Sequence, residues 1–359
     1  MKIQILVDFD VFWTSLAQDI CAAEQHAYVQ TFSFEGDRVG KMLADLLGSA
    51  RVHDRRILVD SFAKIVISDR FLYSPANWFK RELRQEAQET KRLHRTLQAS
   101  GVKIKYGNPF GLSPRRCLRR DHKKLIVIDD RVAYIGGMNF SEHNAAWHDM
   151  MLRIEAQDVA AFLRDDFLAS WEASRLATTK SFAGVALHAL DGRSNSVVFE
   201  KVLKLIDEAQ ASIFVESPYI TFPFYDHLRE ARRRGVRVTI VTPRTNNWSH
   251  FADYARWEAT RCAIDLRLYQ KGMSHLKAML VDDQHLIVGS SNFDLLSYRI
   301  YQEIVAIISD PQVIADFRDR IMNVDLRDSE IPEAQGSARA TWSRLRLKLL
   351  NKGLTLLLD

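Results

Sequence analysis

Short apolar runs alternate along this chain with stretches in which apolar residues recur every three or four positions. The stretches at 11–24 and 198–209 have that helical spacing, so each predicts an amphipathic helix. The runs at 55–62 and 236–243 are short, rich in β-branched residues and closed by turn residues, and each predicts a strand. Strands that alternate with helices indicate an α/β fold.

A long internal duplication organises the sequence. The segment DHKKLIVIDDRVAYIGGMNF, which begins at residue 121, corresponds to SHLKAMLVDDQHLIVGSSNF, which begins at residue 274. Both copies contain His-x-Lys-x4-Asp, then a glycine and an asparagine at the same offsets: His122, Lys124, Asp129, Gly136 and Asn139 in the first copy, and His275, Lys277, Asp282, Gly289 and Asn292 in the second. The copies lie 275 − 122 = 153 residues apart, and with 11 histidines chance gives only about 0.03 matches to the His-Lys-Asp spacing. The chain is therefore built from two related halves.

The relationship extends upstream of the motif. The strand run near residue 26 corresponds to the run near residue 212, an offset of 212 − 26 = 186, so 186 − 153 = 33 extra residues fall in the first half. Most of them lie in the polar region 70–100 and in the approach to His122. The predicted organisation is an α/β fold of two pseudo-symmetric α/β sandwich halves with the active site between them: a first half at 1–175, a polar linker at 176–196, a second half at 197–325 and a basic amphipathic tail at 326–359.

The motif places an imidazole and an ammonium on one side of a strand. The runs at 125–128 and 278–281 are predicted to be buried strands. Side chains alternate along a strand, so His122 shares a face with Lys124, and His275 shares a face with Lys277. The glycine-rich turns that follow bring in Asn139 and Asn292 as amide donors, and we expect glycine there to let the backbone approach a ligand closely.

Two facing copies would surround one phosphorus atom with two histidines, two lysines and two asparagines. One imidazole must be neutral to attack and the other protonated to donate to the leaving oxygen. The lysines supply positive charge, so neither a metal nor an organic cofactor is expected.

Two kinds of carboxylate accompany the motif. A carboxylate bonded to each imidazole would fix its tautomer, and the candidates are Asp149, 27 positions after His122, and Glu303, 28 positions after His275. Asp129 and Asp282 belong to the motif and to the candidate catalytic set. They lie an odd number of positions from their histidines, however, so they are predicted to brace the turn rather than to touch substrate.

Composition narrows the class of protein. The 359 residues are 47% hydrophobic and 26% charged, as in a globular protein, which excludes a disordered chain. The acidic N-terminus lacks the basic region of a signal peptide, and no run approaches 18 uninterrupted apolar residues. The net charge is +5, and basic residues cluster at 115–124 and 229–237. The first cluster favours an anionic partner, and the second is interpreted as a solvated basic face. The tail at 338–359 is a candidate amphipathic helix that either contacts a membrane or packs on the protein itself.

At these motifs the chain resembles the phospholipase D superfamily, whose mark is the duplicated HxKxxxxD followed by a Gly-rich turn and Asn. More narrowly it resembles the bacterial cardiolipin synthases, and among them the shorter ones without N-terminal transmembrane helices. The supporting stretches, beside the motifs, are WHDMMLRIE at 147–155, ESPYITFP at 216–223 and GSSNFDLLS at 289–297.

The resemblance implies that a phosphodiester is cleaved in two steps through a phosphohistidine, with His122 as nucleophile and His275 as acid and then base. It implies phosphatidylglycerol as the phosphatidyl donor, a second lipid alcohol as acceptor and phosphatidylethanolamine as a further candidate substrate. It also implies peripheral binding to the anionic inner face of a bacterial cell membrane, in the cytoplasm, with no nucleic acid partner. Leu296 and Tyr301-Gln302 depart from the pattern of the membrane-anchored synthases, which leaves the acceptor alcohol open.

Three other functions stay open. A phospholipase D would use the same site with water as the acceptor. A nuclease of this superfamily would cleave nucleic acid, although many such nucleases carry one motif and dimerise. A non-catalytic lipid-binding module would not need both imidazoles.

Overall fold

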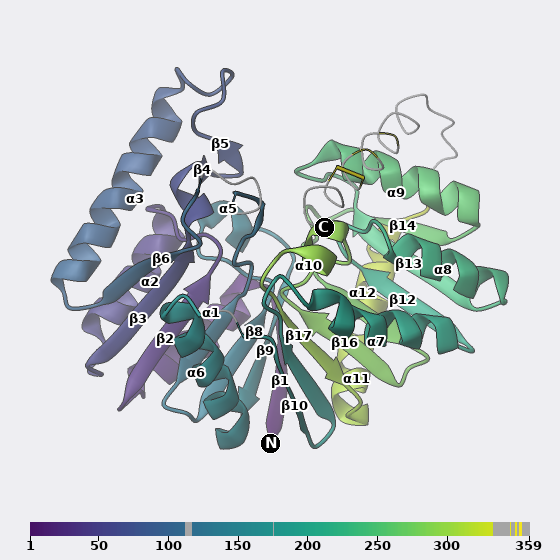
Figure 1. Ribbon diagram of the computed structural model, residues 1–359, viewed down its shortest axis with the longest axis horizontal. Helices are drawn as coiled ribbons and strands as arrows, with labels where there is room; N and C mark the ends of the chain where they lie inside the picture. The colour runs from purple at the N-terminus through teal and green to yellow at the C-terminus, as the bar shows by residue number, and fades with distance from the viewer. Residues whose placement is uncertain (112–116, 175, 333–344, 346–348, 350–351, 354–359) are drawn as a thin grey trace. The chain divides into compact units, whose positions relative to one another are not determined.

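A computed structural model describes residues 1–111, 117–174, 176–332, 345, 349 and 352–353 (Figure 1). It contains two compact units. The first comprises Met1–Thr178 together with Gln302–Ile304, and the second comprises Thr179–Tyr301 and the described residues from 305 onward. The predicted tail at 338–359 lies almost entirely outside the described residues, as do Arg115 and Arg116 of the first basic cluster.

The first unit is built on a seven-stranded sheet with the strand order β1-β9-β8-β7-β2-β3-β6. Strands β2, β3 and β6 are parallel, whereas β7, β8, β9 and β1 join by antiparallel pairing. Its elements are β1 (Lys2–Val7), α1 (Asp8–Cys21), β2 (His26–Thr31), α2 (Arg38–Ser49), β3 (Asp54–Asp60), η1 (Ser61–Lys64), β4 (Val66–Ile67), β5 (Arg70–Phe71), α3 (Arg81–Ala99), β6 (Lys103–Gly107), β7 (Leu125–Ile128), β8 (Val132–Gly136), α5 (Glu142–Ala145), β9 (Met150–Glu155) and α6 (Gln157–Trp171).

The second unit is built on a nine-stranded sheet with the order β10-β11-β17-β16-β15-β12-β13-β14-β18. Its elements are β10 (Thr178–Phe182), β11 (Val185–Ala189), α7 (Asn195–Glu208), β12 (Ser212–Glu216), α8 (Phe224–Arg233), β13 (Arg237–Pro243), α9 (Ser249–Cys262), β14 (Asp265–Tyr269), β15 (Ala278–Val281), β16 (His285–Gly289), α10 (Leu295–Arg299), β17 (Ile304–Ile308), α11 (Pro311–Phe317), η2 (Arg318–Met322), α12 (Asn323–Arg327) and β18 (Ser329–Glu330).

The two sheets repeat the same six-strand order. The series β9-β8-β7-β2-β3-β6 in the first unit corresponds strand by strand to β17-β16-β15-β12-β13-β14 in the second. The α/β fold expected from the sequence is confirmed, and so is its internal duplication. The expected linker at 176–196 differs from expectation, because it contains β10 and β11 of the second sheet.

Each sheet is buried on both faces. In the first unit, Val29 of β2 and Ile126 of β7 pack into one core with Leu16 of α1 and Leu43 of α2. The neighbouring residue Tyr28 points to the other face, where its ring stacks on Phe167 of α6 with the centroids 4.8 Å apart. All four residues of β7 are therefore buried, as an unbroken apolar run requires when both faces are covered.

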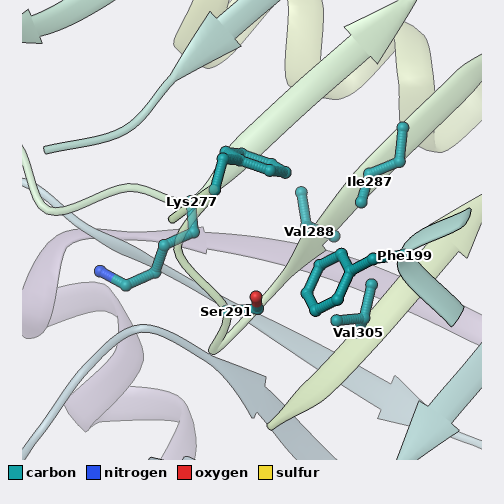
Figure 2. A pocket seen from close by; sticks show the side chains of 7 residues that line it. Phe199, Lys277, Ile287, Val288, Ser291 and Val305 are labelled. Carbon is teal, nitrogen blue, oxygen red and sulfur yellow. The ribbon is translucent and has the colours of Figure 1, made fainter. Parts of the chain in front are cut away.

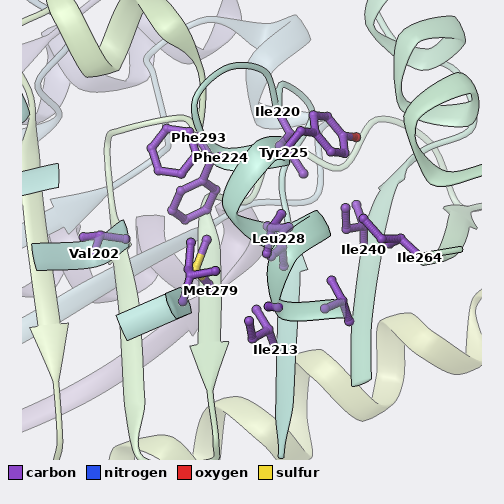
Figure 3. Close-up of a cluster of buried hydrophobic side chains, with 14 of the residues drawn as sticks. Val202, Ile213, Ile220, Phe224, Tyr225, Leu228, Ile240, Ile264, Met279 and Phe293 are labelled. Atoms are coloured by element: carbon purple, nitrogen blue, oxygen red, sulfur yellow. The ribbon is translucent and has the colours of Figure 1, made fainter. Parts of the chain in front are cut away.

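The second unit has the same kind of core, which Figure 3 shows. Met279 of β15 and Ile213 of β12 meet Val202 of α7 and Leu228 of α8, and all four are buried. No helix in the described part of the chain has the length and apolar character needed to cross a membrane.

The units differ most between two corresponding strands. The connection from β3 to β6 covers 61–102, which is 102 − 61 + 1 = 42 residues, whereas that from β13 to β14 covers 244–264, which is 264 − 244 + 1 = 21 residues. The longer connection holds the β4–β5 hairpin besides its long helix α3. The difference of 42 − 21 = 21 residues accounts for most of the 33 extra residues that the sequence placed in the 70–100 region and in the approach to His122.

Candidate functional site

A short backbone pairing brings a carboxylate to His122. The His122 amide donates to the carbonyl of Gln302, and the Gln302 amide donates to the carbonyl of Arg120, each at 2.9 Å. The next residue, Glu303, is fully buried and has its two carboxylate oxygens 3.0 and 3.2 Å from His122 Nδ1. A proton on Nδ1 satisfies this contact, which leaves the lone pair on Nε2.

This pairing differs from the one that position along the sequence suggested. Glu303 was counted from His275, its own copy of the motif, but Gln302–Ile304 belong to the first unit and the carboxylate lies on His122. The candidate residue was found from the sequence because it opens an apolar strand. Its partner could not be found, because a short segment of the C-terminal half belongs to the N-terminal unit.

Lys124 lies beside His122, as strand alternation predicted. Its Nζ donates to the carbonyl of His122 at 2.9 Å and lies 5.3 Å from the centre of the Phe32 ring. That ring in turn meets the His122 imidazole edge-on, with the centroids 5.1 Å apart. Lys124 is 1% exposed. The structure therefore holds one ammonium and one imidazole against a single aromatic wall.

The second motif repeats this local arrangement. Lys277 Nζ donates to the carbonyl of His275, and both residues are buried. The stem of Lys277 borders a small pocket whose wall is mainly apolar, while its ammonium points away from that wall (Figure 2). Because the aliphatic stem of Lys277 lies against apolar side chains, its ammonium is expected to point toward a polar group or a ligand.

The two asparagines follow equivalent turns. Phe140 and Phe293, the residues after them, make parallel bridges to Phe34 and Ile220. Asn139 Oδ1 accepts from Thr31 Oγ1 at 3.3 Å and from the Ser33 amide at 3.4 Å. Asn292 is equally buried, and its Oδ1 has no hydrogen-bond partner among the residues that the structure describes.

The glycines of the first turn allow a close approach between two segments of the first unit. A Cβ at Gly137 would lie 2.3 Å from a carboxylate oxygen of Asp149, and one at Gly136 would lie 2.4 Å from the carbonyl oxygen of Met150. The close approach that the structure shows is to the protein's own Asp149 and Met150. Asp149 is 2% exposed and accepts from the Met150 amide at 2.8 Å.

Asp129 and Asp282 bind backbone at the far end of the motif strands from the histidines. Asp129 accepts from the amides of residues 24–26 at 2.7, 2.7 and 2.9 Å. Asp282 accepts from those of residues 210–212, each at 2.8 Å. Burial raises the pKa of Asp282, but the three amide donors outweigh it and leave that pKa below its ordinary value. Both carboxylates brace the start of the neighbouring strand, as their offset predicted, and their place in the candidate catalytic set has no support in this geometry.

Two cations of the basic run at 115–124, Arg120 and Lys123, are buried and paired inside the first unit. Arg120 Nη1 lies 3.2 Å from Asp60, and Lys123 Nζ lies 2.7 Å from Asp166, with all four residues buried. Burial raises the pKa of Asp121, between them, to about 7. These cations are used inside the first unit and are not available to an anionic surface.

The second basic cluster is partly neutralised on helix α8. Arg229 pairs with Asp226 at 2.8 Å, and Arg233 pairs with Glu230 at 2.9 Å. This fits the solvated face that was expected there. Two further elements of the site, the Phe32 ring beside His122 and the backbone pairing of Gln302, could not be predicted from the sequence.

Comparisons with known proteins agree with this architecture. The family model described as cardiolipin synthase, PLD-like domain, matches residues 16–171 and 202–324. Cardiolipin synthase B of Escherichia coli (strain K12) is 27% identical over 97% of this chain and 86% of its own length. The major cardiolipin synthase ClsA of Bacillus subtilis (strain 168) is 25% identical over 89% of this chain and 69% of its own. Among solved structures, phosphatidylserine synthase of Haemophilus influenzae Rd KW20 has a similar fold, with a TM-score of 0.71 at 15% identity over 99% of this chain and 95% of its own.

Proposed function

Because the chain belongs to the family of cardiolipin synthases with a PLD-like domain, we propose that it is a phosphatidyltransferase that makes cardiolipin from phosphatidylglycerol. The observation that carries the proposal is the duplicated pair of buried lysine and histidine, one pair at the same place in each sheet. Transfer of a phosphatidyl group in two steps needs one group as the nucleophile and a second group as the acid and then the base. Two histidines can fill these two roles, whereas one cannot fill both.

The two motifs act on one phosphorus atom in this mechanism. In the first step His122 Nε2 attacks the phosphorus of phosphatidylglycerol, the bond to the glycerol headgroup oxygen breaks, and His275 gives that oxygen its proton. In the second step His275 takes the proton of the acceptor's hydroxyl, the oxygen attacks phosphorus, and the phosphorus–nitrogen bond breaks. Two phosphatidylglycerol molecules thus give cardiolipin and glycerol.

The buried groups around the two histidines orient the imidazoles and bind the phosphoryl oxygens. Glu303 holds the His122 tautomer in which Nε2 is unprotonated and can act as the nucleophile, and it stabilises the imidazolium that develops. We assign the equivalent task toward His275 to Asp149 on the ground of the repeated topology. Lys124, Lys277, Asn139 and Asn292 would bind the phosphoryl oxygens, so the mechanism needs no metal or organic cofactor.

The substrates place the protein at a membrane. Phosphatidylglycerol is anionic, so the partner is an anionic bilayer, and the proposed location is the inner face of a bacterial cell membrane. The tail at 338–359 is one candidate contact, and its deletion should weaken vesicle binding. Phosphatidylethanolamine stays a candidate second substrate, and nucleic acid is not an expected partner.

The test is lipid mass spectrometry of the purified protein with phosphatidylglycerol vesicles, with and without phosphatidylethanolamine, beside the His122→Ala variant. Cardiolipin that forms only with intact His122, and that forms equally with EDTA, is the expected result. Phosphatidic acid without cardiolipin would make the protein a phospholipase D. No lipid turnover, or strong inhibition by EDTA, would contradict the proposal.

A further inference from the structure

Exposed aromatic side chains are concentrated in one part of the first unit. Of the six that the described residues contain, five lie between residues 71 and 110: Phe71, Tyr73, Trp78, Phe79 and Phe110. Phe79 is 86% exposed. The sixth, Trp248, lies on the second unit. Apolar surface that gathers in this way marks an interaction site, whereas single exposed residues are ordinary.

The fold holds these side chains outward. Beneath them the β4–β5 hairpin packs on α3 through a small core of its own, which consists of Ile67, Leu72, Leu83 and Ala87. The loop between β5 and α3 extends beyond the sheet of the first unit (Figure 1). Leu72 is buried in this core between exposed Phe71 and Tyr73, so the packing of Leu72 leaves the two neighbouring rings on the surface.

Positive charge surrounds the same aromatic face. Residues 70–84 contain four basic side chains, all exposed, and one acidic side chain, Glu82. The basic ones are Arg70, Lys80, Arg81 and Arg84. The Arg84 guanidinium lies 5.7 Å from the Trp78 ring centre. Interleaved aromatic and basic side chains complement the interface of an anionic bilayer, where aromatic rings lie at headgroup depth and cations meet the phosphates.

A chain of aromatic rings joins this face to the catalytic motif. Ring centroids are 5.6 Å apart from Phe71 to Phe62, 5.5 Å from Phe62 to Phe32 and 5.1 Å from Phe32 to His122. Exposed Phe110 also meets Phe62, at 6.4 Å. A lipid whose phosphate lies at His122 and Lys124 therefore has a continuous apolar wall along which an acyl chain can lie.

We propose that residues 70–84 are the membrane-docking surface of this protein, with an anionic phospholipid bilayer as the partner, and that the rings from Phe71 to Phe32 guide a lipid to His122. The proposal rests on the function proposed above. The proposal also explains why the connection between β3 and β6 is the longer one. It contains the β4–β5 hairpin and the loop at 72–80, for which the shorter connection between β13 and β14 has no room.

The test is vesicle co-sedimentation of the full chain with Trp78→Ser/Phe79→Ser. Vesicles of phosphatidylglycerol and phosphatidylcholine in equal amounts are compared with pure phosphatidylcholine. We expect the double variant to bind the anionic vesicles about tenfold more weakly or worse, and Arg81→Glu to weaken binding at low salt. Arg81 opens α3, where a glutamate suits the helix N-terminus, so that variant should fold. Trp248→Ser removes a comparably exposed tryptophan and should bind as wild type does.

Two further readouts separate the possible failures. Hydrolysis of bis(p-nitrophenyl) phosphate, a soluble phosphodiester, should be unchanged in Trp78→Ser/Phe79→Ser, which shows that the site is intact. Brominated lipid should quench wild-type fluorescence more than that of Trp78→Phe. Undiminished vesicle binding by the double variant would overturn docking while leaving the transferase proposal standing, and loss of a dimer in that variant would make the face a self-interface instead. Normal vesicle binding by the wild type without any lipid turnover would contradict the proposed function and leave the docking proposal standing.

Discussion

The contact between His122 and Glu303 determines which ring nitrogen of His122 carries the proton. The carboxylate is fully buried and both its oxygens lie within hydrogen-bond distance of Nδ1, so it favours the tautomer with the proton on Nδ1 and an unprotonated Nε2. Strand alternation predicted correctly that His122 and Lys124 would share a face, because that rule depends only on adjacent residues. It could not assign the carboxylate, because Glu303 lies 303 − 122 = 181 positions away along the chain.

Glu303→Gln should lower kcat about 100-fold or more, because an amide can hold either ring tautomer and cannot stabilise an imidazolium. The measurement is kcat on bis(p-nitrophenyl) phosphate, with circular dichroism as a check on folding. Glu142→Gln, which removes an exposed carboxylate of the same unit, is the control and should keep wild-type kcat. A Glu303→Gln variant within threefold of wild type would rule out an orienting role.

Asp129→Ala should lower the free energy of unfolding and leave kcat nearly unchanged. Three backbone amides lose their charged acceptor, for which we expect about 2 kcal/mol off the free energy of unfolding, measured in urea. Asp282→Ala should act likewise in the second unit. The folded fraction should keep its kcat within a few fold. A loss of kcat as large as that of Glu303→Gln, at unchanged stability, would return these residues to the catalytic set.

Among the elements, strands with two covered faces were the most predictable from the sequence. The motif strands β7 and β15 are unbroken apolar runs, and both were expected. Strand β10 was taken for part of a linker, because four of its five residues are exposed and an exposed strand at a sheet edge has the composition of a loop. Strands β6 and β14 were missed because charged or polar residues interrupt them.

The segment that leads into β7 makes stability depend on pH. Burial raises the pKa of Asp121 to about 7, while the unfolded chain ionises it near 3.8. Its contribution to stability is therefore complete below about pH 4 and is lost as pH rises to about 7. Asp121→Asn removes this dependence, so relative to wild type it should gain about 3 kcal/mol in unfolding free energy between pH 5 and pH 8. Urea unfolding at both values measures this, and an equal difference at pH 5 and pH 8 would contradict the assigned pKa.

At the scale of the whole molecule, duplication was the most informative feature of the sequence. Two copies of one motif, 153 residues apart, predicted two pseudo-symmetric α/β halves, and the repeated strand order of the two sheets confirms them. The offset between the copies also indicated that the first half is longer, mainly at 70–100. It could not indicate that the longer connection contains the β4–β5 hairpin or that Gln302–Ile304 belong to the first unit, because both depend on tertiary packing.

The central claim is that a histidine of these motifs carries the phosphatidyl group between donor and acceptor. The most direct measurement uses phosphatidylglycerol with a labelled phosphate, a rapid alkaline quench that preserves phosphohistidine, and peptide mapping of the protein by mass spectrometry. We expect a labelled phosphohistidine in the peptide that contains His122, formed during turnover and absent from His122→Ala. Turnover of phosphatidylglycerol with no label on His122 or His275 would contradict it.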